Sequence, residues 1–127
     1  MTGPLVLALA LLATLGLKTT PGEAHAALVS SVPAQRQTVT SSPPRVRLTF
    51  NERLEPAFTR VSVWDASGQQ VDLKDGAVDP GNSKVVTVSL PPLRPGRYTV
   101  RYRVLSVDGH IVEASFLFSV APPAPRR

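Results

Sequence analysis

The residues best suited to chemistry lie in one short stretch, Val104 to Glu113 (VLSVDGHIVE). Two apolar, strand-like runs meet there across Asp108-Gly109-His110, and an Asp-Gly pair at such a junction is a common signal for a hairpin turn. Residues two apart in an extended segment point the same way, so the Asp108 carboxylate and the His110 imidazole converge. Such a pair suits a divalent metal ion, although the same residues are also typical of a plain turn with an exposed histidine.

The start of the sequence decides whether another ligand is available. Pro4 to Leu17 is an apolar run. It is too short to span a bilayer, which takes about 20 residues, and it has the length of a signal-peptide core. No Lys or Arg precedes it, so a buried helix or an uncleaved anchor remains an alternative. We expect export, with residues 1–24 as the signal peptide.

The cleavage position determines the new N-terminus. Gly22-Glu23-Ala24 has small residues at −3 and −1 and would leave His25 first. Ala24-His25-Ala26 fits the same rule and would remove His25, and the pattern alone does not choose between them. If His25 is first, its α-amine and ring nitrogen chelate one metal ion. An α-amine, with an ordinary pKa of about 7.7–8.0, deprotonates readily for a metal near neutral pH.

Together with Asp108 and His110, such a terminus supplies three nitrogens and one carboxylate oxygen. This set fits a tetragonal Cu(II) site better than tetrahedral zinc, although zinc also accepts His and Asp ligands. Cu(I) prefers thiolate or thioether sulfur. The chain has no cysteine, and its one methionine, Met1, would leave with the signal peptide.

The rest of the sequence predicts an all-β domain that would position these residues. Five segments alternate between apolar and polar side chains, as half-buried strands do: Arg45–Phe50, Thr59–Trp64, Val85–Leu90, Arg97–Val104 and Val112–Val120. Clusters of turn-forming residues separate them at Asp65–Gln70, Asp79–Asn82 and Pro91–Gly96. We expect one domain over residues 25–120, built as a two-sheet sandwich or Greek-key barrel, and a disordered Pro-rich tail over residues 121–127.

Composition argues against several classes of function. The net charge of +5 comes mostly from scattered arginines, with which no aromatics are interleaved in a stacking pattern. This favours a basic surface over nucleic-acid binding. There is no recognisable Ser/His/Asp arrangement and no Gly-rich phosphate loop, so we expect no enzyme. No second apolar segment follows the first, and no large apolar stripe is evident. We therefore expect no membrane span after cleavage, and a monomer.

Four stretches in this order resemble the CopC-type periplasmic copper-binding proteins. They are His25 to Gln35 (HAALVSSVPAQ), Val46 to Val71 (VRLTFNERLEPAFTRVSVWDASGQQV), Leu90 to His110 (LPPLRPGRYTVRYRVLSVDGH) and Phe116 to Val120 (FLFSV). The similarity covers nearly the whole expected domain, and the combination is specific where any one piece would not be. It implies an Ig-like seven-stranded Greek-key β-barrel, with His25 as the first mature residue.

The resemblance also implies the site. It carries Cu(II) binding onto His25 (amine and imidazole), Asp108 and His110. Glu52 matches an acidic residue near that site, which implies a role in orienting or hydrogen-bonding the amine; the alternative is a surface carboxylate beside Arg53. Some members bind Cu(I) in a Met-rich, His-containing stretch, but Val71 to Ser89 has no Met and no His. We expect one Cu(II) site and no Cu(I) site.

The function implied is that of an exported copper carrier or buffer, in the periplasm or cell envelope, that serves copper homeostasis and resistance. Family context adds a CopD-type membrane copper importer as partner. One alternative is a metal-free Ig-like interaction module, in which Asp108-Gly109-His110 is only a turn. Another is a copper enzyme that activates oxygen on polysaccharides. Against it, the carboxylate ligand would fill a position that such chemistry needs open, and the sequence shows no aromatic platform for a sugar.

Overall fold

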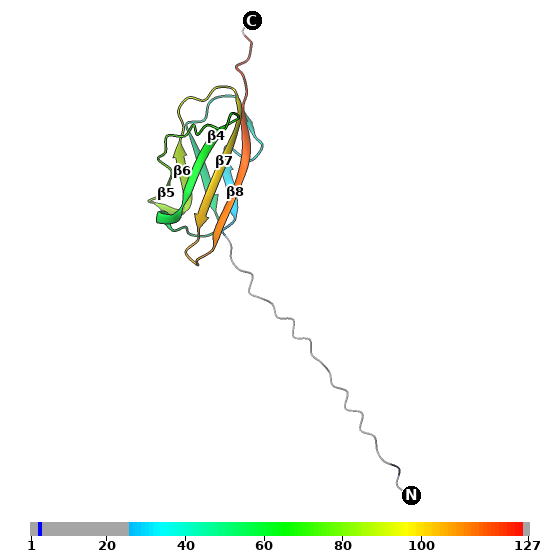
Figure 1. Cartoon of the computed structure of the whole chain (residues 1–127), viewed down its shortest axis with the longest axis vertical. Helices are drawn as coiled ribbons and strands as arrows, with labels where there is room; N and C mark the ends of the chain where they lie inside the picture. Colours follow the sequence, from blue (N-terminus) through cyan, green and yellow to red (C-terminus); the bar gives the residue numbers. More distant parts are fainter. Residues whose placement is uncertain (1–2, 4–25, 126–127) are drawn as a thin grey trace.

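The computed structural model describes Gly3 and residues 26–125. His25 and the expected signal peptide lie outside these described residues, apart from Gly3. Within them the chain forms eight β-strands and one short 3-10 turn, shown in Figure 1. In chain order these are β1 (Leu28–Val32), β2 (Thr38–Val39), β3 (Arg45–Phe50), η1 (Pro56–Phe58), β4 (Arg60–Asp65), β5 (Ala77–Asp79), β6 (Asn82–Ser89), β7 (Gly96–Leu105) and β8 (Ile111–Val120).

Alternation places one face of each long strand in the core. In β7 the aromatic and valine side chains are buried and the arginines are exposed, as the sequence predicts. In β3 the apolar positions are buried in the same way. Because side chains on a strand alternate between faces, each of these strands has one dry face and one wet face. In β8 the pattern holds only in the second half, since Ala114 is exposed beside an open cleft.

The strands form two four-stranded sheets packed face to face. One sheet has the order β1-β3-β6-β5 and the other the order β2-β8-β7-β4. β1 pairs antiparallel with β3, whereas β2 pairs in parallel with β8. If β1 and β2 are treated as a single first strand that passes from one sheet to the other, the sandwich has seven strands. The orders then match those of an immunoglobulin-like Greek-key sandwich, which confirms the predicted fold class.

The core between the sheets is apolar and contains two aromatic pairs. Tyr98 stacks on Phe118 with ring centroids 5.5 Å apart, and Phe50 meets Tyr102 edge to face at 5.4 Å. The Tyr98 hydroxyl donates to the Arg94 carbonyl at 2.6 Å, the contact that closes the corner before this strand in immunoglobulin-like domains. Burial raises the pKa of Tyr98. Packing holds the two sheets together, because the chain has no cysteine.

Three segments distant in sequence meet at one end of the sandwich. Leu28 lies opposite Phe50, so the start of β1 is beside the end of β3. The loop that follows β3 reaches the end of β7 through a bridge between Leu54 and Ser106. In Figure 1 this is the end at which the β7–β8 turn lies. No helix among the described residues is long and apolar enough to cross a membrane.

Candidate metal centre

The segment Ser106–His110 is a tight turn between β7 and β8, as its sequence predicts. The Ser106 carbonyl accepts a hydrogen bond from the Gly109 amide at 2.9 Å, and the Ser106 amide donates to the His110 carbonyl at 2.9 Å. Gly109 has φ = +94°, a backbone conformation that side-chain-bearing residues rarely adopt. A glycine at this position therefore allows the chain to reverse between two residues that carry ligand-type side chains.

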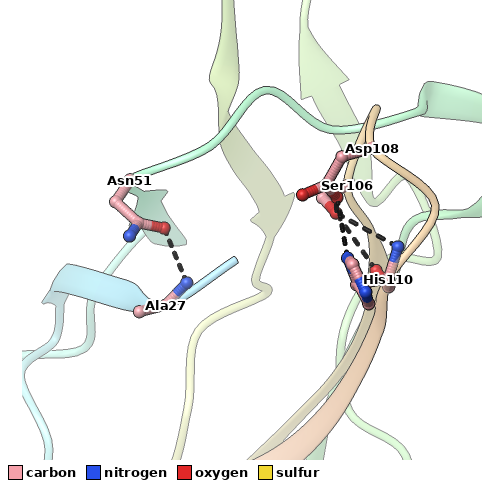
Figure 2. A network of polar contacts seen from close by, with 5 residues as sticks. All are labelled: Ala27, Asn51, Ser106, Asp108 and His110. Atoms are coloured by element: carbon pink, nitrogen blue, oxygen red, sulfur yellow. Dashed lines mark hydrogen bonds and ion pairs between the residues drawn. The ribbon is translucent and has the colours of Figure 1, made fainter. Parts of the chain in front are cut away.

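The turn brings Asp108 and His110 together. Asp108 Oδ1 lies 3.3 Å from His110 Nδ1, and the two side chains are 36% and 33% exposed. Figure 2 shows both side chains on the same side of the turn, with Ser106 between them. His110 Nδ1 itself is shielded from solvent, so the exposed third of the imidazole consists of its other atoms. The predicted convergence of these two residues is confirmed.

Ser106 stabilises the ionised form of the Asp108 carboxyl group. Its hydroxyl donates to Asp108 Oδ1 and also lies 3.3 Å from both the amide and the carbonyl of His110. The hydrogen bond from Ser106 is the main cause that lowers the pKa of Asp108, with His110 adding to it. Hydrogen bonds to the ionised form favour that form. The turn therefore presents a carboxylate that is fully ionised at neutral pH.

The start of the described chain is fixed nearby. Ala26 is 2% exposed. The next residue, Ala27, exchanges two hydrogen bonds with Asn51, from its amide to Asn51 Oδ1 at 2.7 Å and from the Asn51 amide to its carbonyl at 3.0 Å. These contacts hold the chain at the end of the sandwich where the β7–β8 turn lies, and they set the direction from which it enters β1.

One loop connects this anchor to the Ser106–His110 turn. After Asn51, the Arg53 carbonyl accepts a hydrogen bond from the Val107 amide at 3.0 Å, and the Glu55 amide donates to the Leu105 carbonyl at 2.8 Å. Figure 2 shows the Asn51–Ala27 pair to the left of the group formed by Ser106, Asp108 and His110, and the loop that follows Asn51 crosses the top of the view towards Asp108. The entry point of the chain and the candidate ligands are thus attached to the same five-residue segment, residues 51–55.

The described residues account for part of the predicted site. Asp108 and His110 come together as expected, and His25 lies outside the described residues. Glu52 is half-buried in the connecting loop. Within residues 26–125 no group of three or more His, Cys, Asp or Glu side chains could hold a metal ion, so Glu52 does not join the pair. Its role beside the amine stays a prediction.

Two residues that shape the site were not singled out from the sequence. Asn51 anchors Ala27, and Ser106 holds the Asp108 carboxylate. A Ser two residues before an Asp at a turn is a pattern that offers such a bond, so the role of Ser106 could be predicted from the local sequence. No local pattern predicts the role of Asn51, because its partner is 24 residues away in the chain and only the sheet register brings the two residues together.

The donor types and their spacing fit a metal ion. Two donors at about 2.0–2.2 Å from one ion are at most about 4 Å apart, and the carboxylate and imidazole here are within that limit. One oxygen and one nitrogen from positions two residues apart supply half of a four-coordinate site. The remaining donors would have to come from another segment that reaches the turn.

Comparisons with known proteins point to one family. The sequence model of the CopC domain matches residues 28–121. Copper transport protein CutJ of Bacillus subtilis (strain 168) is 32% identical over 98 residues, which are 76% of this chain and 18% of that protein. This chain therefore spans less than a fifth of that relative's length, and the two are similar over the domain alone.

Solved structures agree with this assignment. The crystal structure of CopC from Methylosinus trichosporium OB3b has a TM-score of 0.74 and 35% identity, and the match covers 81% of this chain and all of that one. PcoC of Escherichia coli, described as a methionine-rich copper resistance protein, has a TM-score of 0.64 and 30% identity, and the match covers 76% of this chain and 99% of that one. Both matches exceed three quarters of this chain, so the likeness covers the sandwich as a whole.

Proposed function

Because this chain belongs to the CopC domain family, we propose that it is an exported Cu(II)-binding protein that carries or buffers copper in the periplasm or cell envelope. The coarser role in copper homeostasis follows from relatives whose names state copper transport and copper resistance. The oxidation state, the ligands and the direction of copper transfer are the content of the proposal.

One observation carries the proposal: the loop 51–55 joins the entry point of the chain to the Asp108–His110 turn. Ala26 is buried, and consecutive Cα atoms are about 3.8 Å apart, so a ligand directly before Ala26 would begin at this end of the sandwich. If cleavage leaves His25 as the first residue, its amine and imidazole begin next to the anchor that Asn51 makes with Ala27. This supports His25, Asp108 and His110 as one ligand set.

Each residue has a defined task in this site. His25 would provide two nitrogens, and His110 a third. Asp108 would provide a carboxylate oxygen, which its low pKa keeps ionised. Ser106 orients that carboxylate, and Asn51 orients the chain that carries His25. Glu52 would hydrogen-bond the amine from the connecting loop. Three nitrogens and one oxygen suit Cu(II), and the carboxylate ligand would fill a position that oxygen-activating copper chemistry needs open.

The proposal includes one copper site and no Cu(I) site. Cu(I) is held by soft sulfur ligands, and this sequence has a single methionine at position 1. The relative PcoC is described as methionine-rich, so the two chains differ in the property that a Cu(I) site requires. A CopD-type membrane importer is the proposed partner, and the protein would exchange Cu(II) with it.

The decisive experiment is a Cu(II) titration of the chain that begins at His25, followed by electron paramagnetic resonance of the complex. We expect one equivalent of Cu(II) and a spectrum with nitrogen hyperfine structure. Failure to bind Cu(II), or a spectrum dominated by oxygen ligands, would contradict the proposal and favour the metal-free interaction module.

A matched control tests the N-terminal chelate directly. The same chain with one extra glycine before His25 keeps every side chain but places the free amine on another residue. We expect a large loss of Cu(II) affinity and a changed spectrum. Unchanged affinity would show that the amine of His25 is not a ligand.

A further inference from the structure

A small cavity lies beside the candidate metal centre. It has a volume of about 120 Å³ and lies between η1 and the β7–β8 hairpin, lined by Ala57, Phe58, Arg60, Arg103, Leu105 and Ile111. A cavity of roughly 150 Å³ holds a benzene molecule, so this one is sized for a single branched or aromatic side chain. Ile111 directly follows His110, so the cavity adjoins the candidate ligands.

The walls of this cavity expose large apolar side chains to solvent. Phe58 is 64% exposed and Ile111 is 56% exposed, and Val107 in the neighbouring turn is 47% exposed. The turn that carries Phe58 is held in place, since its backbone is bonded to Glu55, whose amide donates to Leu105. Phe58 and Ile111 line the same cavity, and adjoining exposed apolar side chains are a feature of interaction sites.

The rim of the cavity is cationic. Arg60 and Arg103 are exposed and directly opposite each other in the β4–β7 register, an arrangement of like charges that disfavours the sheet. Within the described residues, no carboxylate lies within 4.0 Å of either guanidinium group. This holds even for the carboxylate of Glu113, which is opposite Arg103 on β8. The rim therefore carries charge that a partner's carboxylates would neutralise.

This rim continues onto the outer face of the second sheet. An open cleft of about 740 Å³ shares Arg60 and Arg103 with the cavity and also contains Arg101 and Trp64, whose guanidinium group and ring are 5.0 Å apart. The nearby Asp72 carboxylate is already used, because it accepts hydrogen bonds from Val63 and Lys74 amides. The positive surface thus extends away from the metal centre along the sheet.

The edge of β4 is not the place where a partner adds a strand. The Val63 carbonyl accepts a bond from the Val71 amide, and the Val63 and Asp65 amides donate to Asp72 and to the Gln69 carbonyl. Since the segment 69–72 already occupies this edge, recognition here depends on side chains. A concave pocket favours a protruding side chain over the surface of a bilayer.

We propose that this cavity and its arginine rim, the Phe58–Arg103 surface, dock a protein partner through a segment that combines one bulky apolar side chain with flanking carboxylates. The inference rests on the proposed function in one respect, namely that the partner exchanges copper with this protein. Docking at the Phe58–Arg103 surface would bring that partner to the Asp108–His110 turn, because Ile111 belongs to both the cavity and the hairpin.

The test uses a defined probe and metal-free protein. The probe is a blocked pentapeptide with two glutamates on each side of one phenylalanine, titrated into ¹⁵N-labelled chain that begins at His25. We expect saturable shifts of the amides of Phe58, Arg60, Arg103 and Ile111, with half-saturation below about 1 mM. The same peptide with lysines in place of the glutamates is expected to leave these amides unshifted.

Matched variants distinguish binding at the Phe58–Arg103 surface from a general effect of the protein's net charge. The double change Arg60→Glu and Arg103→Glu is expected to weaken binding at least tenfold. Arg45→Glu with Arg47→Glu, an equal charge change at exposed positions of β3, is expected to have little effect. Phe58→Ser should weaken binding, whereas Val29→Ser, at a position that is 65% exposed, should not.

Several outcomes would overturn the inference. They are no saturable shift, equal binding of the lysine peptide, equal loss in the two arginine double variants, or stronger shifts of the same amides with phosphatidylglycerol vesicles, which would assign the surface to lipid. Because the titration uses metal-free protein, a failure here leaves the copper proposal standing. A failure of Cu(II) binding, measured separately by spectroscopy, leaves the docking result standing in turn.

Discussion

Asn51 and Ala27 hold each other by two hydrogen bonds, one through the Asn51 side chain at 2.7 Å and one through its backbone at 3.0 Å. Only the first depends on the identity of residue 51. That side chain therefore fixes the chain two residues after His25, while the loop that follows is bonded to the turn that carries Asp108. Positioning of the proposed N-terminal ligand is thus separable from the ligands themselves.

Replacing Asn51 with alanine tests this positioning role. Loss of one hydrogen bond costs about 1 kcal/mol, which corresponds to about a fivefold loss of Cu(II) affinity if the bond acts by orienting the N-terminus. Affinity is measured by competition with a chromophoric chelator. Asn51→Asp keeps an oxygen acceptor for the Ala27 amide and should retain most of the affinity. Equal affinity in Asn51→Ala and the parent chain would show that the anchor does not orient the site.

The candidate ligands are tested by Asp108→Asn and His110→Ala. Removing partners that only support a metal ligand typically costs about 10–100-fold in affinity, so loss of a ligand should cost at least that. Asparagine keeps the shape of Asp108 and an acceptor for the Ser106 hydroxyl. Because both side chains are a third exposed, we expect Tm in the metal-free state to stay within a few degrees. Unfolding of either variant would instead assign that residue a structural role.

Ser106→Ala should raise the pKa of Asp108 towards the ordinary range of an aspartate, because the hydroxyl is the main cause that lowers it. The direction of this change follows because a hydrogen-bond donor stabilises the ionised carboxylate. With the donor present, protons bind to Asp108 only at lower pH. The variant should therefore release copper at a higher pH during acidification. Carboxyl ¹³C shifts of the metal-free protein report the pKa. Ser115→Ala, at an exposed position of β8, serves as the control, and an equal shift there would contradict the assignment.

The hydroxyl of Tyr98 is expected to stabilise the fold independently of the metal. Tyr98→Phe removes its bond to the Arg94 carbonyl, at a cost of about 1 kcal/mol or roughly 4–8 °C in Tm for a domain of this size. Tyr102→Phe is the matched control, since that ring packs on Phe50 and no hydrogen bond of its hydroxyl occurs among residues 26–125. Thermal unfolding followed by circular dichroism measures both. Equal changes in the two variants would count against the Arg94 contact.

The long strands could be predicted from the sequence, but the short ones could not. Arg45–Phe50 coincides with β3, and Arg97–Val104 is one residue shorter at each end than β7. Their alternation is strong because both strands have one face in the core. β2 and β5 have two and three residues, too few for a period to be read. In β1 only Leu28 and Ser31 are half-buried and the other residues are exposed, so its place is set by pairing with β3 rather than by a local pattern.

The site followed the same division. Asp108 and His110 are two residues apart, and the predicted convergence of their side chains is confirmed. The structure achieves it through a tight turn with Gly109 at φ = +94° rather than through an extended segment. Their connection to the start of the domain depends on hydrogen bonds from the Val107 amide to the Arg53 carbonyl and from the Glu55 amide to the Leu105 carbonyl. No local pattern encodes these bonds, because the partners are about 50 positions apart. The resemblance to CopC-type proteins supplied the long-range part for His25, and it also named Glu52, whereas the structure draws attention to the adjacent Asn51.

The entry of β1 beside the β7–β8 turn has a mechanical consequence. One copper ion held by both His25 and His110 would tie the first residue of the chain to a hairpin near its other end. Such a tie limits the freedom of the unfolded chain as a disulfide does, in a sequence without cysteine. Stability would then rise with free copper concentration, so the copper-loaded carrier would outlast the empty one wherever proteases remove unfolded chains.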